Sequence, residues 1–368
     1  MNKHHEIRQV TAYPLDVPLT SSFNIATSDL TAITNLAIAV ELVDGTTGWG
    51  EVPILAPVTT EDQLTARNAV DQAADILAGN NAGEWRKIAA QLQEHFPDYS
   101  AVRCGLEMAL IDALVKSLRL PLYQFFGGCS DYVITDITIP ICPDDKAERL
   151  ARQYQSHGFK IIKTKVGMDL TSDIGRILAI RRGYNDCKLL LDANTGYSVE
   201  QTMMLLTELR KVNIEPVLLE QPLPRDDWEG LGRLAQETGI PIAVDESCRS
   251  PQDAVRIARG NLAQVINIKL AKCGVVQALE IVSIARSSGL GLMIGGMVET
   301  RIAMGFSAHF AAGLGGFDWI DLDTPLLLSY DPVSGGYIAD GARYNLDTGD
   351  FGHGGELKFD ENIPTTHS

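Results

Sequence analysis

The stretch Lys188-Leu-Leu-Leu-Asp192 is a short apolar run that ends in a carboxylate, and this design recurs twice. Pro216-Val-Leu-Leu-Glu220 and Ile240-Pro-Ile-Ala-Val-Asp245 repeat it, and the steps from 192 to 220 and from 220 to 245 are 28 and 25 residues. One step earlier stands Lys163-Thr-Lys165, and one step later stands Ile266-Asn-Ile-Lys269. Each step has the length of one strand–helix repeat. In a closed parallel barrel the carboxyl ends of such strands meet at one rim, where the active sites of that architecture lie.

Strand–helix alternation extends over the second half of the chain and indicates a parallel sheet. Eight strands are predicted, at 133–141, 161–166, 188–192, 216–220, 240–245, 264–270, 291–294 and 318–323. The first third has an α+β pattern, with strands at 10–19, 35–43 and 47–52 followed by helices at 61–77, 84–96 and 101–118. We predict an α/β fold: a (β/α)7β TIM-type barrel at 131–325, an α+β capping domain at 1–130, and a C-terminal segment at 326–368 that returns to the capping domain.

Composition excludes several classes of partner. The net charge of −16 disfavours nucleic acid and anionic membranes, since neither would be attracted. The six cysteines include no Cys-x-x-Cys pair, which favours isolated thiols in a reducing compartment. The first residues lack the apolar core of a secretory signal, and no run reaches membrane-spanning length. We expect a cytoplasmic protein, with an organelle as the alternative.

Asp192, Glu220 and Asp245 are candidate ligands of a divalent cation. Mg²⁺ prefers hard oxygen ligands, commonly a few carboxylates with water and substrate completing the shell. A single carboxylate at a strand end commonly caps the next helix instead. Three in register, with lysines on both flanking strands, favour a metal site.

The flanking lysines are candidate proton carriers. Lys163 and Lys165 are two positions apart on a strand and therefore face the same side. We expect their mutual repulsion to lower a lysine pKa from about 10.4 toward about 7–8, where a general base works well. Lys269 lies four strands around the barrel, on the opposite wall, so that a carbon acid between Lys165 and Lys269 could lose a proton to one and regain it from the other. We interpret Lys272 as a surface or capping residue.

These segments together resemble the signature of the muconate lactonising enzyme subgroup of the enolase superfamily, and the likeness covers essentially the whole chain. The resemblance implies that Asp192, Glu220 and Asp245 bind one Mg²⁺ per subunit and that Lys165 and Lys269 are the acid/base pair. It also implies that Lys163 contacts a substrate carboxylate. Enolase-type sites stabilise an ene-diolate with a metal and a lysine or histidine base.

Asp321-Leu-Asp323 at the end of the eighth strand separates the activities within this subgroup. Two carboxylates at i and i+2 face the same way and can hold a substrate ammonium group, and the pair resembles the Asp-x-Asp of dipeptide epimerases. Thr138, Gly296 and Met297 match that family's substrate-contact positions. We therefore expect an isomerase that acts on a dipeptide and assembles as a homo-oligomer. The alternatives are an N-acylamino acid racemase, an o-succinylbenzoate synthase or a muconate cycloisomerase, and, from another class, a barrel that only binds a ligand.

The predicted lid carries no cation. From Gln9 to Ala66 there is no lysine or arginine, whereas seven acidic residues are present. Relatives that act on Ala-Glu carry an arginine at the position where our alignment places Ser28. A substrate of the form L-Ala-Xaa with a hydrophobic or basic Xaa is therefore favoured, although Arg301 is a possible substitute for the missing arginine.

Overall fold

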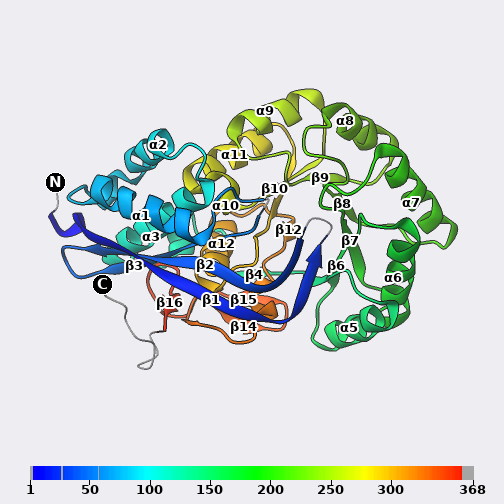
Figure 1. The fold of residues 1–368 in the computed structure, drawn as a ribbon, viewed down its shortest axis with the longest axis horizontal. Helices are drawn as coiled ribbons and strands as arrows, with labels where there is room; N and C mark the ends of the chain where they lie inside the picture. The colour runs from blue at the N-terminus through cyan, green and yellow to red at the C-terminus, as the bar shows by residue number, and fades with distance from the viewer. Residues whose placement is uncertain (1–2, 26–27, 57, 359–368) are drawn as a thin grey trace.

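The computed structural model describes residues 3–25, 28–56 and 58–358 (Figure 1). An eight-stranded parallel sheet carries the second half of the chain, in the order β12-β11-β10-β9-β8-β7-β6-β5. The backbone N–H of Asp136, next to β5, donates to the carbonyl of Ile320 in β12 at 2.8 Å, which links the two edge strands. The predicted TIM-type barrel is confirmed.

Each strand of this sheet lies within a range expected from the sequence. The strands are β5 (Ile137–Ile139), β6 (Ile161–Lys165), β7 (Lys188–Asp192), β8 (Leu218–Glu220), β9 (Ile242–Val244), β10 (Val265–Ile268), β11 (Gly291–Ile294) and β12 (Trp319–Ile320). The helices between them are α5 (Asp144–Ser156), α6 (Leu170–Gly183), α7 (Val199–Lys211), α8 (Trp228–Glu237), α9 (Pro251–Gly260), the short α10 (Leu270–Cys273), α11 (Val275–Ser287) and α12 (Arg301–Leu314).

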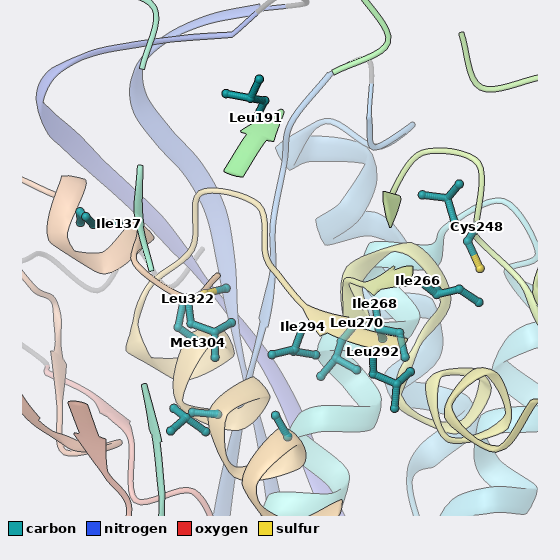
Figure 2. Packing of buried hydrophobic residues seen from close by; sticks show 14 of the residues in the cluster. Ile137, Leu191, Cys248, Ile266, Ile268, Leu270, Leu292, Ile294, Met304 and Leu322 are labelled. Atoms are coloured by element: carbon teal, nitrogen blue, oxygen red, sulfur yellow. The ribbon is translucent and has the colours of Figure 1, made fainter. Parts of the chain in front are cut away.

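Alternate residues of the strands separate into two apolar layers, as the two-residue period of a strand requires. One set packs against the helices; Ile266 and Ile268 of β10 and Ile294 of β11 belong to it (Figure 2). The other set points into the barrel and forms its own cluster, which consists of Leu190, Leu218, Ala243, Val265 and Met293. Two positions after each of these apolar residues, the inward face becomes largely polar. This apolar cluster therefore lies inside the barrel, beneath the polar ends of the strands.

The first predicted barrel strand, 133–141, is wrong as a single strand. It is divided into β4 (Tyr132–Ile134) and β5, because the chain changes partners at Thr135 and Asp136. Thr135 N donates to Ala342 O in the tail, whereas Asp136 N donates to Ile320 O in the barrel. Accordingly β4 pairs with β15 (Arg343–Asn345), and only β5 belongs to the barrel.

The capping region packs a meander on a buried helix. Its strands are β1 (Ile7–Ile25), β2 (Ser28–Leu42) and β3 (Thr47–Val52), and its longer helices are α1 (Gln63–Leu77), α2 (Trp85–His95) and α3 (Ser100–Ser117). β3 lies directly on α3, since a Cβ at Gly48 would stand 2.1 Å from Ala113 N and one at Gly50 would stand 2.0 Å from Gly105 O. Residues 101–115 of α3 are all buried, so this helix is the centre of the region.

The C-terminal segment returns to the capping region (Figure 1). It contains η3 (Thr324–Leu327), β13 (Val333–Ser334), β14 (Ile338–Asp340), β15 and β16 (Glu356–Leu357). Val333 packs in one cluster with Leu15, Trp49 and other residues of the meander. The backbone N–H of His353 donates to Asp112 Oδ1 of α3 at 2.8 Å. The capping region is thus built from both ends of the chain.

The remaining short elements are η1 (Lys3–His5), η2 (Ala82–Glu84) and α4 (Leu122–Phe125). All six cysteines are free thiols. Within the described ranges, no helix has the length and apolar character that crossing a membrane requires.

Candidate functional site

Strand register places the three predicted metal ligands at the ends of neighbouring strands. Asp192 pairs with Lys165 on one side and with Glu220 on the other, and Asp245 directly follows β9. All three carboxylates are buried. Two neighbouring residues, Asn194 and Gln221, have φ angles of +39° and +35°. A left-handed backbone in residues other than glycine costs of order 1–3 kcal/mol and clusters at functional sites.

Lys163 lies among the carboxylates. Its Nζ atom is 3.0 Å from Asp192 Oδ2, 2.7 Å from Glu220 Oε2 and 2.6 Å from Asp321 Oδ2. Lys165 Nζ lies 2.6 Å from the same Oδ2 of Asp192. Both lysines therefore face into the barrel mouth, as their spacing predicts.

Lys269 enters from the opposite wall, with its Nζ 2.7 Å from Asp245 Oδ2. Lys272 is not a surface residue, contrary to our interpretation: it is 5% exposed, and its Nζ donates to Asp245 Oδ1 at 2.6 Å and to Asn267 O at 3.0 Å. The four-residue helix α10 turns Lys272 back beneath Asp245. Lys272 therefore holds a predicted metal ligand in place.

The expected downward shift of a lysine pKa is wrong for Lys163. Burial by itself would lower the pKa of Lys163, but the charges of Asp192, Asp321 and Glu220 outweigh it and raise that pKa well above its usual value. The pKa of Lys269 is raised in the same way, with Asp245 as the largest opposing charge. At Lys163 and Lys269 the charges of carboxylates outweigh that of any neighbouring ammonium group.

The charges of the site fit a divalent cation. Six buried carboxyl groups and four buried lysines gather at these strand ends; they are Asp136, Asp192, Glu220, Asp245, Asp321 and Asp323, and Lys163, Lys165, Lys269 and Lys272. Buried charge is costly unless it is compensated. Burial, together with neighbouring carboxylates, accordingly raises the pKa values of Asp136, Glu220 and Asp323. Hard oxygen donors whose charged forms are destabilised by burial and by one another suit a divalent cation such as Mg²⁺.

The predicted ammonium subsite lies at the end of β12, two strands from β10 and Lys269. Oxygen atoms of Asp136, Asp321 and Asp323 lie within 4.8 Å of one another, and all three residues are buried. Thr138 N donates to Asp323 Oδ2 at 2.6 Å, which fixes that carboxylate. Asp136 was missed from the sequence, although it lies two positions before Thr138 on the same face of the chain.

An apolar wall completes the cavity. Phe23 of β1 and Leu55 and Val58 of the segment after β3 line it from the capping side. Gly296, Met297 and Val298 line it from the barrel. A Cβ at Gly296 would lie 2.1 Å from Met304 Cε and 2.7 Å from Glu299 Oε2, so that a larger residue there would require those two side chains to move.

Neither of the two residues considered for substrate specificity, Ser28 and Arg301, is seen at the cavity. Ser28 begins β2, but its side chain lies outside the described residues. Arg301 does not line the cavity; its Nε is 2.5 Å from Asp331 Oδ2, and its guanidinium lies over the ring of Tyr337. It is already paired and therefore does not replace the missing lid arginine.

The chain matches two models of one enzyme family. Residues 8–127 match the mandelate racemase/muconate lactonizing enzyme N-terminal domain, and residues 146–361 match the enolase C-terminal domain-like model. The "L-Ala-D/L-amino acid epimerase" of Populus trichocarpa is 50% identical over 96% of this chain and 86% of its own length. The "Aromatic dipeptide epimerase" of Herpetosiphon aurantiacus is 42% identical, over 92% of this chain and 96% of its own.

A solved structure has the same architecture with ligands bound. The dipeptide epimerase of Enterococcus faecalis V583, complexed with Mg and the dipeptide L-Leu-L-Tyr, superimposes with a TM-score of 0.91. It is 31% identical and covers 95% of this chain and 99% of that one.

Proposed function

Because the chain belongs to the mandelate racemase/muconate lactonizing enzyme family of the enolase superfamily, we propose that it is a magnesium-dependent dipeptide epimerase. The activities named for its relatives bear out the predicted isomerase and its cofactor. The reaction inverts the Cα of the C-terminal residue of L-Ala-Xaa by removing a proton from one face and returning one to the other. The observation that carries the proposal is the position of Lys165 and Lys269 at strands four apart in the barrel, each paired with a buried carboxylate.

Asp192, Glu220 and Asp245 would hold the cation. Bound Mg²⁺ supplies a Lewis acid that stabilises negative charge on the substrate carboxylate during proton removal. Lys163 contacts that carboxylate from the same side, and Asp321 and Asp323 bind the substrate ammonium. These two ends fix the dipeptide across the mouth, with its Cα between Lys165 and Lys269.

Each lysine takes one face of the Cα. Lys165 removes or returns the proton on its face, and Lys269 does the same on the other face, so that the two roles exchange when the opposite epimer binds. Thr138 steadies Asp323 through its backbone N–H, and Gly296 and Met297 border the substrate. The apolar residues Phe23, Leu55 and Val58 exclude water from the reacting carbon.

The apolar wall favours a hydrophobic Xaa. A glutamate side chain against it would be left without a partner, at a cost of about 1–3 kcal/mol, which corresponds to a loss of roughly tenfold or more in kcat/KM. Ser28→Arg should partly restore activity on Ala-Glu.

The proposal is tested by incubating L,L-dipeptides with the enzyme and Mg²⁺ in deuterium oxide. Epimerisation adds one mass unit at the Cα and produces the L,D product, and N-acetylation of the dipeptide should abolish it because the ammonium is lost. Equal activity on N-acetylated dipeptides would favour the racemase alternative. No exchange at any Cα would favour a barrel that only binds a ligand.

A homo-oligomeric assembly and a cytoplasmic location are further parts of this proposal; sedimentation and fractionation would test them.

A further inference from the structure

Asn35, in the middle of β2, connects the two walls of the apolar cavity. Its side chain is completely buried. Oδ1 accepts from the backbone N–H of Ile54 at 2.9 Å. Nδ2 donates to the carbonyl of Val298 at 3.0 Å and to Glu51 Oε1 at 2.8 Å. One side chain thus joins a strand of the capping region, the segment after β3 and a loop of the barrel.

Both backbone partners belong to cavity-lining segments. Ile54 precedes Leu55, and Val298 follows Met297; Leu55, Met297 and Val298 all line the cavity. The segment after β3 is closed on itself, because Thr59 N donates to Leu55 O at 2.9 Å and Leu55 N donates to Thr59 Oγ1 at 2.9 Å. A shift at Ile54 is therefore transmitted to Leu55.

Glu51 fixes which way the amide of Asn35 points. Its carboxylate is buried at the start of α12, where it accepts from Thr300 N at 3.0 Å and from Thr300 Oγ1 at 2.7 Å. A carboxylate only accepts, so the NH₂ group of Asn35 must face it, and the oxygen then faces Ile54. Favourable backbone N–H groups surround Glu51 at this helix N-terminus.

We infer that Asn35 is a positioning residue that sets the width of the cavity between Leu55 and Val298, and with it the fit of the substrate side chain. This rests on the proposed function, in which that cavity holds the side chain of the C-terminal residue. Asn35 does not line the cavity itself. It acts through two backbone groups, and Glu51 orients it.

Asn35→Asp is the sharpest test, because it preserves shape and the acceptor for Ile54 N–H but removes the donor to Val298 O. It also places a second carboxylate beside Glu51. We expect KM for L-Ala-L-Leu to rise about tenfold, since a hydrogen bond that orders one wall is lost, while kcat changes less than threefold. The ratio of kcat/KM for L-Ala-L-Leu to that for L-Ala-L-Trp should move closer to one. Backbone amides around Val298 should exchange faster with deuterium.

Asp112→Asn is the matched control. Asp112 is also a fully buried capping-region residue that accepts backbone hydrogen bonds, from Trp49 and His353, but it does not border the cavity. A comparable loss of thermal stability with unchanged KM is expected. A KM rise as large as that of Asn35→Asp would overturn the inference, because general loosening of the cap would then explain both.

The double variant Asn35→Asp/Glu51→Gln separates positioning from folding. The glutamine amide introduced at position 51 can donate to the carboxylate introduced at position 35 and restore the buried pair with one charge, but Val298 O still lacks its donor. Stability should recover while KM stays high; recovery of both would show a purely structural role and sink the inference. This variant also carries the test if Asn35→Asp fails to fold.

If the wild type exchanges no dipeptide Cα, the proposed function fails, whereas amide exchange around Ile54 and Val298 still decides the role of Asn35.

Discussion

The polar floor of the barrel mouth and the apolar wall above it are built in different ways. The floor takes its residues from adjacent parallel strands, so that one register places Lys165 beside Asp192 and Asp192 beside Glu220. The wall takes Phe23, Leu55 and Val298 from three segments far apart in the sequence. The floor is therefore determined by the strand–helix repeat, whereas the wall is determined by how the capping region packs on the barrel. We expect changes in the floor to abolish chemistry and changes in the wall to alter which substrate is used.

Removal of the cation should have the largest effect. Exhaustive chelation, or Glu220→Gln, should abolish turnover, because the substrate carboxylate loses its Lewis acid. Circular dichroism should show that the fold persists. Full activity after chelation, measured by Cα deuteration, would contradict the assignment of Asp192, Glu220 and Asp245.

Loss of either lysine comes next. Lys165→Ala and Lys269→Ala should each lower epimerisation by about 10²–10⁴-fold, the usual contribution of a positioned acid or base. The remaining lysine can still exchange the Cα proton of one epimer without inverting it, which mass spectrometry of L,L and L,D substrates in deuterium oxide detects. Normal epimerisation by Lys269→Ala would mean that another group returns the proton.

A substitution in the wall should have a smaller effect on activity, and the effect should differ between substrates. Phe23→Ala removes apolar contact from the substrate side chain, and we expect kcat/KM for L-Ala-L-Phe to fall about tenfold, as the loss of one to two kcal/mol of burial implies. Activity on L-Ala-L-Ala, whose side chain is too short to need this contact, serves as the internal reference. If both substrates lose activity equally, Phe23 supports the lid and not the specificity.

The smallest effect concerns stability alone. His309 on α12 accepts from Tyr123 N at 3.1 Å, and burial lowers its pKa to about 3. Because this folded-state pKa lies below the unfolded value of about 6.5, the unfolded chain binds the extra proton first. The stabilisation is present above pH 6.5 and is lost as pH falls, at up to about 1.4 kcal/mol per pH unit.

His309→Gln should flatten that slope between pH 6.5 and 5.0 in urea unfolding and leave kcat at pH 7 unchanged. Identical slopes for the two proteins would place the pH dependence on other groups.

The sequence predicted the floor better than the wall, for physical reasons. Period-two alternation and repeat length determine where Lys163, Asp192 and Asp245 point, and both can be read along the chain. Asn35 looked like an ordinary strand residue, because its partners are 19 and 263 residues away. Lys272 was interpreted as a surface or capping residue because the sequence does not show the four-residue helix α10, which directs its side chain to Asp245. The upward pKa shift of Lys163 comes first from Asp192 on the neighbouring strand and then from Asp321, which is 158 residues distant.

The docking of the C-terminal segment on α3 and the meander has a consequence for biosynthesis. His353, which donates to Asp112, lies 241 positions after it in the chain. At a translation rate of roughly 5–20 residues per second, the meander and α3 leave the ribosome about 10–50 s before their last partner. During that interval the barrel is being made, and Leu15 and Trp49 still lack Val333. The capping region is therefore completed only after the barrel has been made, so a chain truncated before Val333 would carry the lysines and carboxylates of the site under an incomplete cap.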